Sequence, residues 1–254
     1  MKIKNWTHWA ATWFGMTLLK KSLHYRLKGA GAEWLQSVSA NVPSIFNRVD
    51  FILDQCSQKR VLHIGFTDHP YTVERTQSGE LLHLQLKKVT GHLMGLDVEA
   101  NAISQYKAIT NDTAVYTGDI IQGYPQAAID FDPEIILLSE VLEHLTDPYK
   151  AVQILHDYFP AGTTVLVTVP NYTALDSIAS SLQKTESVHS HHHWYFSPFT
   201  LQKLFDHTKF QLQQLHFGMY YQPRTRVNAI LKHFPFNGDC IMALFTIIKT
   251  NEHG

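Results

Sequence analysis

Short apolar runs separated by amphipathic stretches make up most of the chain after residue 59. Apolar runs of strand length lie at residues 60–65, 91–98, 113–116, 134–138 and 163–169. Between these runs, residues 99–109 and 148–158 place apolar side chains at helical spacing. Strands that alternate with helices are typical of α/β proteins, in which right-handed crossovers put helices on both faces of a parallel sheet. The pattern therefore predicts an α/β fold.

The pattern continues on both sides of this alternating region. The amphipathic residues 44–55 predict a helix that leads into the sheet, and residues 200–210 predict another helix. Residues 210–217 and 240–249 predict two late strands. Residues 71–86, which separate the first strand from the second, predict an insertion or an extended first helix.

The first 58 residues have a helical pattern in which Trp6, Trp9 and Trp13 share one face, with basic residues at both ends. Such a helix could lie in a membrane interface, or it could pack its tryptophans on the main domain as part of a substrate lid. Its apolar run is too short and too interrupted to span a bilayer. We expect an N-terminal helical appendage over residues 1–43 and the main domain over residues 44–254.

Composition narrows the class of protein. The chain has 254 residues, of which 44% are hydrophobic and 17% are charged, and its formal net charge is -1. This balance suits one globular domain with a modest appendage and gives no electrostatic reason to expect a nucleic-acid partner. Cys56 and Cys240 are far apart, and the N-terminal residues lack the apolar core of a signal peptide. We therefore expect a cytoplasmic protein without disulfides.

Chemically distinctive residues follow three of the predicted strands. Gly65 ends the first, Asp97 ends the second, and Asp119 and Ile120 follow the third. Ligands of open α/β sheets bind beyond the carboxyl ends of the strands. There, Asp97 could accept the hydroxyls of an adenosine ribose, while Asp119 accepts the adenine amino group and Ile120 packs on the ring.

The run Ser-Glu-Val-Leu-Glu-His-Leu-Thr-Asp-Pro at residues 139–148 resembles a motif after the fourth strand of class I S-adenosylmethionine-dependent methyltransferases. The resemblance covers residues 44 to 250. It implies a Rossmann-like seven-stranded sheet with a closing strand pair, helices on both faces and S-adenosyl-L-methionine as the cofactor. The implied cofactor contacts lie at four strand ends and are His63, Gly65, Phe66, Asp97, Val98, Asp119, Ile120, Ser139 and Glu140.

The first motif departs from the family pattern of a leading acid and a Gly-x-Gly-x-Gly loop. This chain has His63 in place of the acid and retains only Gly65. A nicotinamide dinucleotide site is disfavoured, because Phe66, Thr67 and His69 would obstruct the pyrophosphate that closely spaced glycines admit. Similar first motifs occur in methyltransferase-like proteins found with bacterial glycan assembly. The departure also permits a non-catalytic relative that acts as a binding or scaffold protein.

Histidines are the candidate general bases, because their pKa lies near neutrality. His144 lies within the 139–148 motif, where it could act on the substrate or hold the loop. His192 and His193 precede Phe-Ser-Pro in a segment that resembles the acceptor-side motif of methyltransferases of the ubiquinone-biosynthesis type. A metal site is not expected, because adjacent histidines rarely point at one ion. A polar loop without function is the alternative for each histidine.

Two further segments bear on the acceptor. Residues 171–187 predict a mobile cover over the substrate, and Arg224, Arg226 and Lys232 could bind a phosphate or carboxylate or be solvated surface charges. The predicted reaction is O- or N-methylation of a small-molecule acceptor, for which the resemblance suggests a sugar of a bacterial glycan or its precursor. We expect His192→Ala to lower turnover far more than cofactor affinity.

Overall fold

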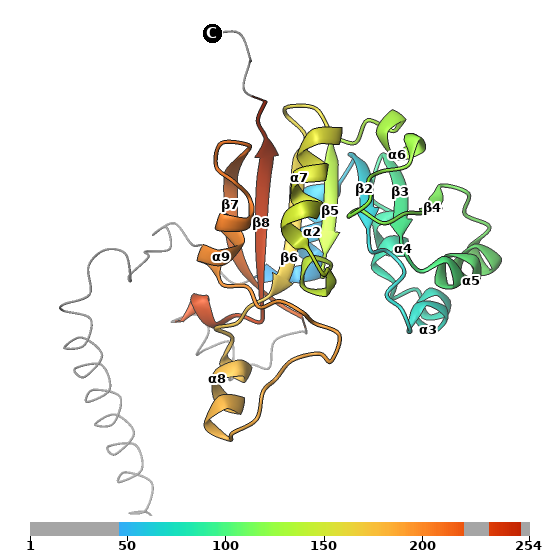
Figure 1. The fold of residues 1–254 in the computed structure, drawn as a ribbon. Coiled ribbons are helices and arrows are strands. Elements are labelled where there is room, and N and C mark those ends of the chain that lie inside the picture. Colours follow the sequence, from blue (N-terminus) through green and yellow to red (C-terminus); the bar gives the residue numbers. More distant parts are fainter. Residues whose placement is uncertain (1–45, 221–233, 250–254) are drawn as a thin grey trace, which may run out of the picture. The chain divides into compact units, whose positions relative to one another are not determined.

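The computed structural model describes residues 46–220 and 234–249. These residues form one mixed sheet in the order β1-β7-β8-β6-β5-β2-β3-β4 (Figure 1). The strands are β1 (Phe46–Asn47), β2 (Arg60–Ile64), β3 (His92–Asp97), β4 (Val115–Thr117), β5 (Ile135–Ser139), β6 (Thr164–Pro170), β7 (Phe210–Met219) and β8 (Cys240–Ile247). Apart from the two-residue β1, this is the seven-stranded layout that the family resemblance implied. The fold class is confirmed.

Strand β8 is the closing strand of the sheet. It pairs antiparallel with β6 on one side and with β7 on the other, whereas β2, β3, β4, β5 and β6 are parallel neighbours. Every residue of β5 is buried, and so are all residues of β6 except its two end residues. Strands buried on both faces need apolar residues throughout, so the apolar runs at residues 134–138 and 163–169 could be predicted as strands.

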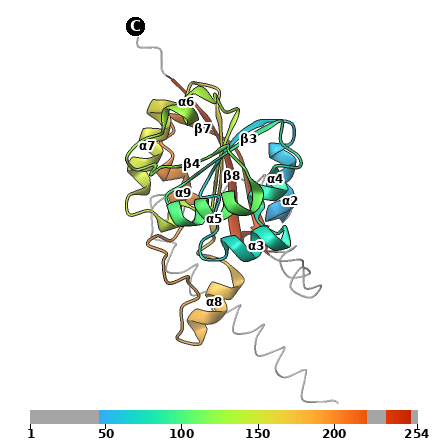
Figure 2. The same ribbon diagram turned by 90° about the vertical axis from the view of Figure 1, so that its right-hand side faces the viewer.

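Helices cover both faces of the sheet (Figure 2). They are α2 (Arg48–Cys56), α3 (Thr72–Ser78), α4 (Leu82–Leu86), α5 (Ala100–Thr110), α6 (Gln126–Asp130), α7 (Pro148–Tyr158), α8 (Leu175–Leu182) and α9 (Pro198–Leu204), with short 3-10 turns η1 (Leu142–His144) and η2 (Pro235–Asn237). On one face, Val152 of α7 and Leu201 of α9 share a core with the sheet. On the other, Ile52 of α2 packs with Val61 and Leu137.

Two predicted helices have different bounds in the structure. Helix α9 ends at Leu204, so the prediction of a helix over residues 200–210 is wrong in its second half. The side chain of Asp206 accepts hydrogen bonds from the Thr208 amide and hydroxyl, both at 2.9 Å, and such local bonds favour a turn over a helix. Helix α2 begins at Arg48, because the side chain of Asn47 caps it by accepting from the Val49 and Asp50 amides.

The segment at residues 71–86 is two short helices, α3 and α4, and not one extended helix. Gly79 ends α3 with a left-handed φ of 77°, a conformation that glycine adopts without steric cost. The segment at residues 171–187 contains α8. Its predicted mobility stays a prediction.

Some expectations fall on residues that the structure does not describe. The appendage over residues 1–43 with its tryptophan face lies outside the described residues, as do Arg224, Arg226 and Lys232. The domain boundary near residue 44 stays a prediction. Within residues 46–220 and 234–249, none of the helices has the length and apolar character needed to traverse a bilayer.

Candidate active site

Gly65 follows β2, which lies between β3 and β5 in the middle of the parallel part of the sheet. Its φ is 71°, and its amide donates to the Leu96 carbonyl at 2.8 Å. A Cβ at this position would lie 2.5 Å from Cγ2 of Val141, which follows β5. Glycine is therefore required here for two reasons, the left-handed backbone and the close approach of Val141.

Asp97 ends β3 on the same edge of the sheet and is 7% exposed. Its Oδ2 accepts hydrogen bonds from the amide and the hydroxyl of Thr67, both at 2.9 Å, and its Oδ1 accepts from the Glu99 amide at 3.0 Å. A carboxylate offers about four acceptor positions, so one remains for a ligand, and the Thr67 hydroxyl holds a place that a ligand hydroxyl could take. The adjacent Val98 side chain is 55% exposed.

Asp119 and Ile120 follow β4, as predicted. Asp119 Oδ1 accepts a hydrogen bond from the Ile121 amide at 2.9 Å, which fixes the carboxylate at the start of the loop. Ile120 is 4% exposed and belongs to the main hydrophobic core. Asp119 is thus accessible at the end of β4, while Ile120 anchors the loop after β4 to the hydrophobic core.

His63 and Phe66 lie in an interior aromatic cluster. His63 Nδ1 is 3.2 Å from Nδ1 of His83 on α4, and the Phe66 ring contacts His83 and Tyr106. Burial, followed by the neighbouring His83 and Arg48, holds the pKa of His63 well below its usual value. Both side chains therefore pack beneath the loop that carries Gly65.

Ser139 and Glu140 belong to a polar network at the end of β5. Ser139 Oγ accepts from Nη1 of Arg48 at 2.6 Å and shares a hydrogen bond with the Thr168 hydroxyl at 3.1 Å. The Glu140 carboxylate accepts from the Thr168 hydroxyl at 2.8 Å and from the Tyr220 hydroxyl at 2.6 Å. Glu140 has a φ of 57°, which is unusual for a residue other than glycine and often marks a functional site.

Sequence reasoning missed three members of this network, Arg48, Thr168 and Tyr220. They come from α2, the end of β6 and the residue after β7. Arg48 also lies over the Tyr220 ring, with its guanidinium carbon 5.4 Å from the ring centroid. An arginine on an amphipathic helix and a hydroxyl at a strand end carry no local signal of this role.

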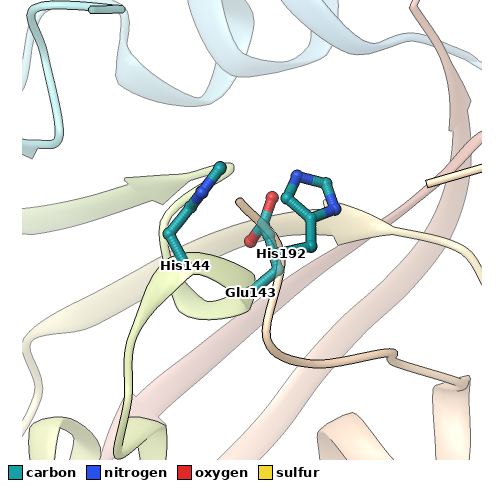
Figure 3. A group of neighbouring side chains, drawn as sticks. All are labelled: Glu143, His144 and His192. Atoms are coloured by element: carbon teal, nitrogen blue, oxygen red, sulfur yellow. The ribbon is translucent and has the colours of Figure 1, made fainter. Parts of the chain in front are cut away.

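Glu143, His144 and His192 come together beside this network (Figure 3). Each of these residues has a ligand-type atom within 4.8 Å of those of the other two. The rings of His144 and His192 meet edge to face, with centroids 4.6 Å apart. The structure thus brings together His144 and His192, two of the three histidines that the sequence suggested as general bases. Glu143 was not singled out from the sequence.

Main-chain hydrogen bonds fix the histidine-rich segment against η1. The Glu143 carbonyl accepts from the amides of His193 at 2.7 Å and Trp194 at 3.3 Å, and the Trp194 indole donates to the Leu145 carbonyl at 2.8 Å. These bonds bring His192 to His144. The His193 side chain is exposed and is not part of the three-residue group.

The pKa values of all three groups are shifted from their usual values. Burial, followed by the neighbouring Glu140, raises the pKa of Glu143 well above its usual value. Burial and the neighbouring histidines lower the pKa of His192 to about 4, and burial also lowers that of His144. At neutral pH both imidazoles are therefore uncharged and carry a free lone pair.

The strand-end residues fit an adenosine-type cofactor. Asp97 retains acceptor capacity, Asp119 presents a second carboxylate two strands from β2, and the exposed Val98 offers an apolar surface beside Asp97. A ribose needs acceptors for its hydroxyls, and a flat base needs an apolar surface with a polar edge. The chemistry of this set matches both needs.

Comparisons with known proteins agree with the fold. Residues 43–215 match the family described as methyltransferase domain. A comparison of the sequence with curated proteins finds no significant match.

Solved structures with the same fold include three with low sequence identity. A chain of the complex between the Haloferax volcanii Trm112 methyltransferase activator and a candidate methyltransferase is 12% identical, with a TM-score of 0.53 over 80% of this chain and 90% of that one. The small RNA methyltransferase HEN1 is 14% identical, with a TM-score of 0.55 over 85% of this chain and 28% of that one. A candidate S-adenosylmethionine-dependent methyltransferase from Listeria monocytogenes is 10% identical, with a TM-score of 0.50 over 78% and 96%.

The family match covers more than half of the chain, and the sheet, apart from the short β1, has the seven expected strands with an antiparallel β8. The enzyme class and the cofactor that the sequence predicted are thereby confirmed. The chain belongs to the methyltransferase domain family, and it is a class I S-adenosylmethionine-dependent methyltransferase.

Proposed function

We propose that this methyltransferase methylates an oxygen or nitrogen atom of a small molecule, and that the acceptor binds beside Glu143, His144 and His192. The observation that carries the proposal is the convergence of these three side chains at the end of β5, next to the strand ends that suit the cofactor. Main-chain bonds from His193 and Trp194 to Glu143 stabilise the convergence.

In the proposed cofactor site, Asp97 accepts from the ribose hydroxyls, Val98 and Asp119 contact the base, and Gly65 leaves room for the loop. Ser139 and Glu140 line the end nearest the acceptor. His63, Phe66 and Ile120 support these positions from the interior, where their contacts with protein already bury them. S-adenosylmethionine supplies an activated methyl group, so the protein must mainly orient the reactants and remove a proton.

The acceptor side contributes proton handling. An acceptor hydroxyl must lose its proton as its oxygen forms the new bond to carbon. The uncharged imidazoles of His144 and His192 have lone pairs that can take up this proton at neutral pH. We therefore assign acceptor activation to these two histidines. His193 contributes its backbone, through the bond to Glu143.

A hollow of about 540 Å³ lies between α8 and the segment that connects it to α9, and it favours a small acceptor. Tyr172 and Tyr195, which line it, are 56% and 43% exposed, and their rings meet with centroids 5.2 Å apart. Trp194 beside them is 45% exposed. Exposed aromatic faces with polar tips suit the ring of a sugar or an aromatic compound.

A radiolabel experiment tests the proposal. The full chain is incubated with S-adenosylmethionine labelled in the methyl group and an extract of the cells that produce the protein, and small molecules, RNA and protein are then separated. We expect label in the small-molecule fraction, abolished by Asp97→Ala and retained by the neighbouring Glu99→Gln. His192→Ala should lower turnover at least about tenfold while cofactor affinity stays within about twofold.

Two results would contradict the proposal in different ways. Label in RNA or protein would show that the acceptor is a macromolecule. No label in any fraction, from a protein that binds S-adenosylhomocysteine, would support the non-catalytic binding or scaffold alternative.

A further inference from the structure

Glu143 is the most unusual side chain of the candidate site. It is 0% exposed, and neither carboxylate oxygen has a hydrogen-bond donor among the described residues. A buried carboxylate without a donor is costly unless it takes up a proton or faces a cation. Glu140 beside it adds a second negative charge, while the positive charge of Arg48 acts in the opposite direction.

The two histidines complete a set of three ligand-type groups. The group of Glu143, His144 and His192, called here the EHH cluster, keeps its ligand atoms within 4.8 Å of one another. In Figure 3 the Glu143 carboxylate lies between the two imidazole rings. Ligands of one ion at about 2.0–2.2 Å from it are separated by about 3 to 4 Å, so a small rotation of the side chains would suffice.

We propose that the EHH cluster binds one divalent transition-metal ion and leaves an open coordination position on the acceptor side. Two imidazoles and one carboxylate form a set that prefers first-row transition metals such as Mn²⁺, Fe²⁺, Co²⁺ or Zn²⁺ over Ca²⁺, which prefers oxygen ligands. Three protein ligands with a free position are typical of catalytic metal sites.

The role of the ion rests on the proposed function. A metal at the EHH cluster would lower the pKa of an acceptor hydroxyl in the open position, so that the proton passes to solvent and the oxygen becomes a better nucleophile. His144 and His192 would then act by holding the ion. The polar network of Ser139, Glu140 and Thr168 next to the cluster would position the acceptor.

Cobalt binding tests the site without any acceptor or cofactor. The full chain, purified without a polyhistidine tag and stripped with a chelator, is titrated with Co²⁺ and followed by visible absorption and equilibrium dialysis. We expect one Co²⁺ per chain, with the d–d bands of a four- or five-coordinate ion. Glu143→Gln, which keeps the size and removes the charge, should weaken binding at least about tenfold, and so should His192→Gln.

Thermal unfolding of each variant checks that the fold is intact.

The exposed histidines supply the matched control. His189 and His191 lie next to His192, and their rings meet with centroids 5.2 Å apart, so a surface histidine pair could capture Co²⁺ by itself. His191→Gln should leave binding unchanged. The proposal is overturned if Co²⁺ does not bind at millimolar concentration, or if His191→Gln weakens binding while Glu143→Gln does not.

The outcomes separate this proposal from the proposed function. If the protein binds the metal but methylates no small molecule, the metal site is supported and its role in activating an acceptor hydroxyl is rejected. Methyl transfer that persists in the chelator-treated protein and in Glu143→Gln would retain the methyltransferase proposal and reject the metal's part in it.

Discussion

Gly65 and Gly79 have almost the same left-handed backbone, with φ of 71° and 77°, but different surroundings. A Cβ at Gly65 would lie 2.5 Å from Val141 Cγ2, whereas a Cβ at Gly79 would have no atom within 4 Å. The two positions therefore separate the conformational cost of a side chain from the steric cost. Only Gly65 belongs to the candidate cofactor site.

We expect Gly79→Ala to lower the free energy of unfolding by about 1–2 kcal/mol, which is the cost of a left-handed alanine. Gly65→Ala should cost this amount and a further ~1–3 kcal/mol for the overlap with Val141. Urea denaturation measures both. Adding Val141→Ala to Gly65→Ala removes Cγ2 and should recover the steric part, and equal costs for the two glycine variants would contradict the account.

Glu140 shows why the candidate site was only partly predictable at the residue scale. The sequence marks it through the motif at residues 139–148, but its φ of 57° and its bond to Tyr220 follow from the tertiary structure. Arg48, Thr168 and Tyr220 lie 91, 28 and 80 positions from the residues that they contact. No local pattern encodes contacts over such separations.

At the scale of elements, the contact between β2 and α4 assigns His63 a structural role. His63 pairs with His83 through their Nδ1 atoms at 3.2 Å, within a ring cluster that includes Phe66 and Tyr106. Burial lowers the pKa of His83 to about 3; the negative charge of Asp112 acts against this shift, and the positive charge of Lys87 adds to it. The pKa of His63 is lowered in the same direction.

This pair makes stability depend on pH. In the unfolded chain each histidine takes up a proton below about pH 6.5, whereas the folded protein keeps both uncharged. The unfolded state therefore binds more protons, and stability should fall with falling pH by about 1.4 kcal/mol per pH unit for each histidine, until the folded pKa near 3 is reached for His83.

Denaturation between pH 7 and 5 measures this slope. In the double variant His63→Leu/His83→Leu, the free energy of unfolding should change less with pH than in wild type, by up to about 2.7 kcal/mol per pH unit. This difference in slope does not depend on the stability of the variant at pH 7. His207, whose side chain is 93% exposed, gives the control His207→Gln with an unchanged slope. An unchanged slope in the double variant would contradict the burial of neutral histidines.

Helices and strands could be predicted from the sequence where the residue pattern fitted only one type of element. Strands β5 and β6 match the predicted runs to within a residue or so at each end, because strands buried on both faces need apolar residues throughout. Helix α9 was predicted six residues too long, from Leu204 to Phe210, because the apolar spacing continues past its end. The Asp206 turn, and the pairing of Phe210 with Ile247, decide the boundary there.

At the scale of the whole molecule, the sheet topology brings the candidate cofactor-binding residues together, although the first motif retains only one glycine. The parallel order β6-β5-β2-β3-β4 places Gly65, Asp97, Asp119 and Ser139 at one edge of the sheet. Alternating strands and helices predicted this edge from the sequence. The convergence of Glu143 with His192 required the path of the chain after β6, which the sequence pattern did not predict.

The central claim is that the strand ends of this sheet bind S-adenosylmethionine despite the reduced glycine motif. Calorimetric titration of S-adenosylhomocysteine into the full chain tests it most directly, with Asp97→Ala and the neighbouring Glu99→Gln compared with wild type. We predict micromolar affinity, about -8 kcal/mol, for wild type and Glu99→Gln, and at least about tenfold weaker binding for Asp97→Ala. No binding at millimolar ligand, or equal binding by a folded Asp97→Ala, would contradict the account.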